Sequence, residues 1–241
     1  MEKKLQDKLK KEAAIKAANF VENGTIVGLG TGSTVKFLVD ELGRKVKEEN
    51  LSFTGVTTSK RTAFQAKSLG IRIVGLDSIA QIDLTIDGAD QVDNNFNGIK
   101  GGGAALLWEK IVATNSKKNI WIIDQSKLVD RIGSFPLPVE VIPFGVSHVL
   151  NKFKKLNFHP VLRLEKNNKA VVTDSQNYII DLHLNKINDP IKLSDQLINT
   201  VGVVGHGLFL NIVDKVIVGQ DGQPLILENP NKLSKSQEAM I

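Results

Sequence analysis

The residues with the clearest chemical potential lie in one short stretch of the chain. Lys100 is followed by three consecutive glycines, Gly101, Gly102 and Gly103, and then, on the next predicted helix, by Glu109. Glycines leave backbone N–H groups open to a ligand, and a helix that starts just after them adds its positive end. A cation, an amide-lined turn and a carboxylate in this order can bind an anion and move a proton.

A helix must position Glu109 for that purpose. At helical spacing it shares a face with Ala105, Val112 and Ala113, so its carboxylate would point toward apolar packing. Partial desolvation would then raise its basicity. A lone glutamate on an amphipathic helix is more often a solvated surface residue, so the burial of Glu109 is the property that separates the two interpretations.

A second glycine turn lies near the start of the chain. Residues 25–30 predict a buried strand, and a helix is expected over residues 33–46. The turn between them contains Thr31, Gly32, Ser33 and Thr34. Strand, glycine turn and helix together form a phosphate-binding arrangement.

A dinucleotide-binding fold is the obvious competitor for this turn. Ser33, however, stands where the third glycine of that fingerprint belongs. The next strand, at 53–57, ends in Thr58 and Ser59, whereas a ribose-binding fold places an acidic residue there. Two hydroxyls at a helix start suit one phosphate better than a pyrophosphate.

Helices and strands continue to alternate along the first half of the chain. This pattern predicts an α/β, doubly wound (Rossmann-like) fold with a mainly parallel sheet. The further elements that we expect are helices at 5–20 and 60–69 and strands at 71–74, 84–86 and 119–124.

Carboxylates follow one of these strands, where ligands collect in such sheets. Asp87, Asp90 and Asp93 come directly after residues 84–86. A divalent metal could use them, but their spacing matches no calcium loop and the four histidines lie far along the chain, so we predict no metal. Lys127, after the strand at 119–124, is a candidate phosphate contact.

Three prolines within residues 135–143 break the alternation and predict a domain boundary. We expect a Rossmann-like domain of residues 1–134 plus 207–241 and a smaller α+β (ferredoxin-like) domain of residues 135–206. Strands at 208–210 and 215–219 should rejoin the first sheet, and the last dozen residues should be frayed. Within the smaller domain we expect helices at 145–155 and from Asp189 onward, and strands at 160–164, 169–173 and 178–182.

Composition limits the class of protein. A hydrophobic content of 41% over 241 residues supports a sizeable core, and no run is long and apolar enough for a signal peptide or membrane span. The net charge is +5, but the lysines are scattered along the chain with 26 acidic residues mixed among them, which argues against nucleic acid as a partner. With no cysteine the chain has no disulfide or thiolate site, and we expect a soluble cytoplasmic protein.

As a set, these motifs resemble the ribose-5-phosphate isomerases of the A type. Their order and spacing also match, from the first helix to about Gly222, although residues 204–207 depart from the pattern. The motifs that carry the resemblance are Gly-Leu-Gly-Thr-Gly-Ser-Thr at 28–34, Asp-Gly-Ala-Asp at 87–90, Lys-Gly-Gly-Gly-Ala-Ala at 100–105 with Glu-Lys-Ile at 109–111, and Phe-Pro-Leu-Pro-Val-Glu-Val at 135–141.

The resemblance implies interconversion of D-ribose 5-phosphate and D-ribulose 5-phosphate through an enediol(ate), in the non-oxidative branch of the pentose phosphate pathway. It implies no metal or cofactor, and a homodimer or a tetramer of dimers. Glu109 would move the proton, Asp87 would assist ring opening, and Lys100 with the Gly101 and Gly102 backbone would stabilise the enediolate. The implied substrate contacts are Lys10, Thr31, Gly32, Ser33, Thr34, Asp87, Gly88, Ala89, Asp90, Lys100, Gly101, Gly102, Gly103 and Lys127.

Two other classes of protein share this type of fold. A sugar-phosphate-sensing transcription regulator needs a DNA-binding helix-turn-helix, and only about twenty residues precede the first predicted strand. A CoA-transferase-like protein would use a glutamate as nucleophile rather than as base, and trapping of an acyl-enzyme would favour it.

Overall fold

A computed structural model describes residues 2–232 of the chain, which divide into two compact units. The first unit contains residues 2–88, 111–127 and 212–232 of the described part, and the second contains Ala89–Lys110 and Leu128–Asn211. The expected domains, 1–134 plus 207–241 and 135–206, differ from these two units. Residues 89–110, 128–134 and 207–211 were expected in the first domain but belong to the second unit.

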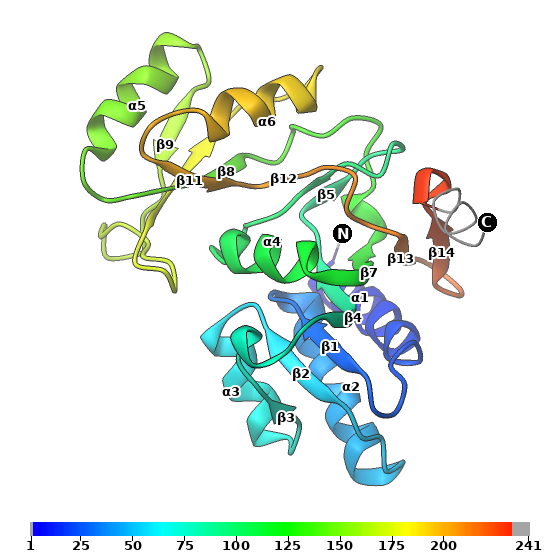
Figure 1. Ribbon diagram of the computed structural model, residues 1–241. Coiled ribbons are helices and arrows are strands. Elements are labelled where there is room, and N and C mark those ends of the chain that lie inside the picture. Colours follow the sequence, from blue (N-terminus) through cyan, green and yellow to red (C-terminus); the bar gives the residue numbers. More distant parts are fainter. Residues whose placement is uncertain (1, 233–241) are drawn as a thin grey trace, which may run out of the picture. The chain divides into compact units, whose positions relative to one another are not determined.

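The first unit is built on a seven-stranded sheet in the order β14-β13-β7-β4-β1-β2-β3 (Figure 1). All neighbouring strands pair in parallel except β14, which pairs with β13 in the antiparallel sense. The predicted α/β fold with a mainly parallel sheet is therefore confirmed. The strands are β1 (Ile26–Leu29), β2 (Thr54–Thr57), β3 (Arg72–Ile73), β4 (Ile82–Gly88), β7 (Ser116–Asp124), β13 (Lys215–Gly219) and β14 (Leu225–Glu228).

Helices α1 (Lys3–Ala18) and α2 (Ser33–Glu48) bury their apolar stripes in one cluster with this sheet. Leu38 of α2 is completely buried there, and burying a leucine side chain stabilises a fold by roughly 1.5–3 kcal/mol. Ser59 is the N-cap of helix α3 (Lys60–Ser68), and its hydroxyl oxygen accepts a hydrogen bond from the Thr62 N–H. A short 3-10 turn, η1 (Leu76–Ser78), precedes β4.

The second unit contains a four-stranded antiparallel sheet in the order β11-β8-β10-β9. Its elements follow one another as β8–α5–β9–β10–α6–β11, which is the ferredoxin-like arrangement expected for this part of the chain. The elements are β8 (Leu137–Val141), α5 (Val146–Lys155), β9 (Pro160–Leu162), β10 (Tyr178–Leu182), α6 (Pro190–Ile198) and β11 (Val203–His206).

A three-stranded sheet completes the second unit and corrects one expectation. Strand β12 (Leu208–Phe209) does not rejoin the first sheet, because it pairs with β6 (Gly98–Ile99), which in turn pairs with β5 (Gln91–Val92). Only Gly207 separates β12 from β11, so the chain has no length in which to cross over.

The proline-rich segment is itself a strand, β8, and all of its residues are buried. Pro138 fits because the β11 register covers only Val139, Glu140 and Val141. The strand expected at 169–173 is reduced to isolated bridges. Of the tail expected to fray, residues 233–241 lie outside the described part. Within residues 2–232 no helix is both long enough and apolar enough to cross a membrane.

Candidate active site

The first predicted turn joins β1 to α2. Gly32, at the helix N-cap, has a φ of 135°, a conformation that favours glycine. The first N–H groups of α2, from Ser33 onward, have no intrahelical partner, and Gly32 has no side chain that could cap them. Ser33 is exposed and Thr34 is buried. Amide donors at the positive end of a helix suit a phosphate group.

Thr31 plays a different part from its neighbours, because its hydroxyl is buried in a chain of hydroxyls. It donates to Ser59 Oγ at 2.8 Å, Ser59 donates to Thr62 Oγ1 at 3.0 Å, and Thr62 donates to the Gly30 carbonyl at 2.8 Å. Thr58 Oγ1 lies 2.7 Å from Thr31 Oγ1. These partners were not predicted as site residues, although Thr58 and Ser59 stood out at the strand end.

Asp87, near the end of β4, is almost fully buried and anchors the same turn. Its Oδ1 accepts hydrogen bonds from the Thr31 N–H at 2.9 Å and the Gly88 N–H at 2.7 Å. A Cβ at position 30 would lie 1.8 Å from this oxygen, so only glycine allows the strand to pass so close. The carboxylate is thereby fixed against the turn.

The parallel sheet places the other predicted residues of the first unit. Because β7, β4 and β1 are neighbours, their carboxyl ends carry η2 (Gln125–Lys127), Asp87 and Thr31 to one edge of the sheet. Lys10 is half-buried on α1, which packs against β7 and β13.

The triple glycine lies in the second unit and is held from two sides. The Asp90 carboxylate accepts from the Gly102 N–H at 2.8 Å. On the other side, Arg163 Nη1 donates to the carbonyls of Gly101 and Gly102, at 2.8 and 3.2 Å, while its Nε donates to Asp181 at 2.8 Å. Arg163 lies in none of the predicted motifs, and no local pattern marks it in the sequence.

Glu109 lies in the first turn of α4 (Leu106–Thr114) and is only 4% exposed. Its predicted burial is confirmed, and Ala105, Val112 and Ala113 are buried as well. Lys100, 2% exposed, places its Nζ 3.4 Å from Glu109 Oε1. The ion pair offsets part of the cost of burying either charge alone.

A second lysine follows Glu109 on the same helix. Lys110 Nζ donates to the carbonyls of His206 at 2.7 Å and Leu208 at 2.9 Å. Burial lowers the pKa of Lys110 to about 8. Burial, helped by the Lys110 charge, lowers the pKa of His206 to about 3, so its ring is neutral near pH 7.

Another buried carboxylate, Glu140 of β8, was not predicted as a site residue. It accepts hydrogen bonds from Thr173 Oγ1 at 2.8 Å and Asn177 Nδ2 at 3.0 Å. Burial raises its pKa, and these bonds together with the backbone N–H of Leu107 oppose that shift. Glu140 thus meets the amino end of the helix that carries Glu109.

The third aspartate of the acidic motif has a local role. Asp93 Oδ1 accepts from the backbone N–H groups of Asn95 and Asn97, both at 2.9 Å, which closes the turn between β5 and β6. Among residues 2–232 no group of three acidic, histidine or cysteine side chains could hold a metal ion.

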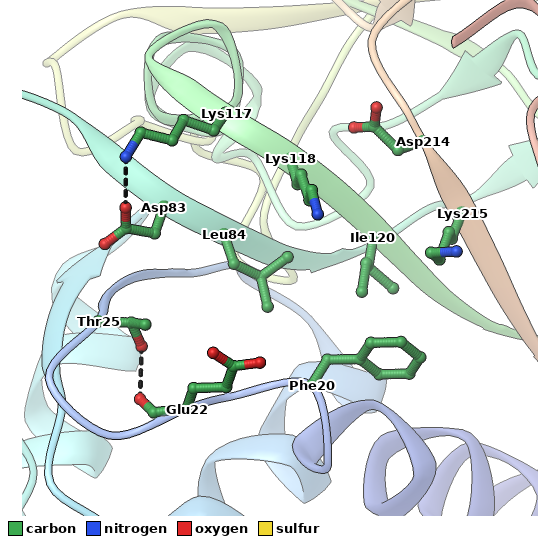
Figure 2. Close-up of a pocket in the computed structure, with 10 residues that line it drawn as sticks. All are labelled: Phe20, Glu22, Thr25, Asp83, Leu84, Lys117, Lys118, Ile120, Asp214 and Lys215. Atoms are coloured by element: carbon green, nitrogen blue, oxygen red, sulfur yellow. Dashed lines mark hydrogen bonds and ion pairs between the residues drawn. The ribbon is translucent and has the colours of Figure 1, made fainter. Parts of the chain in front are cut away.

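A separate hollow of about 450 Å³ lies at the opposite edge of the first sheet, at the amino ends of β4 and β7 (Figure 2). Figure 2 shows Lys117 pointing to Asp83, with an N–O distance of 2.8 Å. The Ile26 N–H and Lys117 lower the pKa of this aspartate. The lining carries charges of both signs and contains none of the predicted site residues.

The fold and these groups define an α/β protein equipped for acid–base chemistry on a phosphorylated small molecule. The model of the family described as Ribose 5-phosphate isomerase A (phosphoriboisomerase A) matches residues 54–223. The chain belongs to this family.

Relatives match almost the whole chain. A protein of Bifidobacterium longum subsp. infantis named Ribose-5-phosphate isomerase A is 65% identical over 96% of this chain and 100% of its own length. The protein of that name from Enterococcus faecalis is 58% identical, over 92% and 98%. The solved structure of ribose 5-phosphate isomerase A from Methanocaldococcus jannaschii is 38% identical, with a TM-score of 0.88 and coverage of 92% and 98%. A D-ribose-5-phosphate isomerase in complex with phospho-erythronic acid is also 38% identical, with a TM-score of 0.90 and coverage of 92% and 99%.

Proposed function

We propose that the chain interconverts D-ribose 5-phosphate and D-ribulose 5-phosphate, the reaction for which its family is named, in the non-oxidative branch of the pentose phosphate pathway. The observation that carries the proposal is the buried pair of Lys100 and Glu109 next to the glycine turn. The similar isomerase bound to phospho-erythronic acid, a phosphorylated sugar acid, supports the same class of ligand. The reaction as proposed uses no metal and no cofactor.

Glu109 is proposed as the base. Its carboxylate takes the proton from carbon 2 of the open-chain aldose and returns it to carbon 1 of the enediolate, while the hydroxyl proton moves from O2 to O1. The carboxylate therefore ends each turnover in its starting state. Its place in the first turn of α4 and its burial support this role, because a buried base is fixed relative to its helix.

Lys100 and the glycine amides are proposed to stabilise the negative charge on the enediolate oxygen. The Gly102 N–H already donates to Asp90, so the proposal assigns the oxyanion contact to the amides on either side of it. In a trans peptide the C=O and N–H point in opposite directions, so the hold of Arg163 on the Gly102 carbonyl turns the Gly103 N–H away from that side chain. Preorganised donors of this kind stabilise developing charge without reorganising during the reaction.

Asp87 is proposed to assist ring opening: it takes the proton of the carbon 1 hydroxyl and returns it to the ring oxygen O4 as the C1–O4 bond breaks. Asp90 is proposed to contact hydroxyls of the sugar beside Gly88 and Ala89. The phosphate is assigned to Gly32, Ser33 and Thr34, with Lys10 and Lys127 adding positive charge there or at the far hydroxyls. The open amides at the start of α2 support this assignment. Thr31 is expected to contribute its backbone and rigidity, because its hydroxyl already bonds to Ser59.

Solvent exchange tests the proposed reaction. Ribose 5-phosphate incubated with the protein in D₂O should gain deuterium at carbon 2 and yield ribulose 5-phosphate labelled at carbon 1. The rate should be the same with and without a chelator. A chelator-sensitive rate would contradict the metal-free route, and an acyl-enzyme trapped by hydroxylamine would favour the CoA-transferase chemistry instead.

The proposal extends to assembly and location. We expect a homodimer or a tetramer in the cytoplasm, with no nucleic-acid or membrane partner. The mass in solution, measured by light scattering after size-exclusion chromatography, checks the assembly, and fractionation of the source cells checks the location. A monomer at working concentration would contradict the expected assembly.

A further inference from the structure

We propose that Phe209 is a positioning residue of the isomerase, whose ring face holds the Lys100 ammonium in place for the proton transfer at Glu109. The inference rests on the proposed function. Phe209 is completely buried, and Lys100 Nζ lies 5.2 Å from the centroid of its ring. An ammonium at this distance over an aromatic face is attracted by the negative face of the π-system, most strongly where water is excluded.

The segment that carries Phe209 is fastened to the backbone of Lys100. The Lys100 N–H donates to the Gly207 carbonyl at 2.9 Å, and the Gly207 N–H donates to the Pro138 carbonyl at 2.7 Å. A Cβ at position 207 would lie 2.2 Å from the Lys100 carbonyl oxygen, so this approach requires glycine. The pairing of β12 with β6 then sets Phe209 opposite Gly98, two residues before Lys100. The same segment therefore fixes both the main chain of Lys100 and the ring of Phe209.

Lys110 fastens the same segment to the helix of Glu109. Its Nζ donates to the carbonyls on either side of Gly207, those of His206 and Leu208, and lies 4.9 Å from the centroid of the Phe209 ring. Two ammonium groups thus share one ring. One belongs to the glycine turn and the other to the residue that follows the proposed base.

A ring has an advantage over a polar partner at this position. The Lys100 side chain is long and flexible, and its ammonium has to face both a carboxylate and, in the proposed reaction, an oxygen of the substrate. The aromatic face attracts the whole cation without accepting a directed hydrogen bond, so it fixes the place of the ammonium without dictating where each N–H points. An aliphatic side chain of the same size would pack but would not attract the cation.

Fluorination of the ring separates this role from packing, because each fluorine weakens the negative face while hardly changing the shape. Phe209 is replaced in the full chain by mono-, di- and trifluorophenylalanine. We expect kcat to fall stepwise, by about tenfold in total, with KM within about twofold of the parent value. A kcat that stays flat along the series would overturn the proposal, as would a loss confined to KM.

Two controls make the result specific. Phe153 is equally buried in the same unit and packs against Phe158, so its fluorination should leave kcat unchanged, and an equal decline there would overturn the proposal. In a Lys100→Met background the Phe209 series should lose its effect on the residual rate, and a persisting decline would also overturn it. Lys100→Met alone tests the proposed function: if it keeps normal turnover, the role assigned to Lys100 fails, whereas a strong loss together with a flat Phe209 series rejects only this inference.

Discussion

The two groups of site residues use different physical means. In the first unit the turn at residues 31–34 is built from backbone amides and buried neutral hydroxyls, with Asp87 as its one buried carboxylate anchor. In the second unit charged side chains hold the site residues in place. Lys100 pairs with Glu109, Arg163 pairs with Asp181, and Lys110 donates to backbone carbonyls. A neutral cradle can bind a permanent anion such as phosphate, whereas moving a proton requires charged groups whose positions are fixed. Substitutions in the turn at residues 31–34 should therefore affect binding, and substitutions among the charged groups of the second unit should affect turnover.

Among the substitutions, Glu109→Gln should have the largest effect on activity. Removal of the base should lower kcat by about 10²–10⁴ with KM within about threefold, because shape and polarity are retained. Steady-state kinetics with ribose 5-phosphate measure both constants. Glu165→Gln, at an exposed position in the same unit, is the matched control and should behave as the parent does. Near-normal turnover of Glu109→Gln would mean that another group is the base.

Arg163→Met should come next, with a loss of about ten- to a hundredfold in kcat, less than removal of a direct oxyanion donor. Its cause would be the release of the Gly101 and Gly102 carbonyls. Asp181→Asn keeps Arg163 and an acceptor for it, so its loss should be clearly smaller. If Arg163→Met instead raised KM alone, the glycine turn would be a binding element and the contrast between the two groups would disappear.

Thr31→Val tests the neutral group. The change keeps the shape but removes the hydroxyl that accepts from Thr58 and donates to Ser59, so the turn should loosen and KM rise about tenfold with kcat nearly unchanged. Ser78→Ala removes an exposed hydroxyl of the same unit and should alter neither constant. A fall in kcat as large as that of Arg163→Met would contradict the assignment of the turn at residues 31–34 to substrate binding.

His206→Gln should have the smallest effect on activity at pH 7 and a distinct effect on stability. The folded pKa of about 3 lies below the ordinary 6.5, so the stability linked to the neutral ring is complete above pH 6.5 and is lost as pH falls toward 3. Between pH 8 and pH 5 the wild type should lose about 2 kcal/mol of unfolding free energy from this group, and the variant should not. Urea titrations of both proteins at the two pH values measure the difference, and parallel losses would refute the buried neutral ring.

Much of the fold could be predicted because its signals are local. The strands β1, β4 and β7 are apolar runs, β1 ends in a glycine turn, and parallel strands bring their carboxyl ends to one edge without any long-range knowledge. The prolines in and around β8 concealed a central strand, because a break in composition and a strand that tolerates proline look alike in sequence. The pairing of β12 with β6 depends on contacts far apart in the chain and has no local signal.

The site residues also differ in whether a local signal marks them. Glu109, Asp87 and the residues of both turns lie in motifs and could be named from the sequence. Arg163 and Phe209 are single residues whose importance comes only from what they touch. Glu140 lies in the motif at 135–141, but its buried contacts were not evident from that motif. Charge–carbonyl and cation–π contacts leave no pattern in one sequence, so they become visible only with the fold.

The buried hydroxyl chain under the first turn also has a direction. Since Thr31 donates to Ser59, Ser59 to Thr62 and Thr62 to the Gly30 carbonyl, Thr58 is the donor to Thr31. The protons of these hydroxyls are ordered head to tail, and none can be exchanged with solvent unless its neighbours turn with it or the segment opens. Their hydroxyl resonances should therefore persist together in water and vanish together, so that the rate of their disappearance reports how often this turn opens.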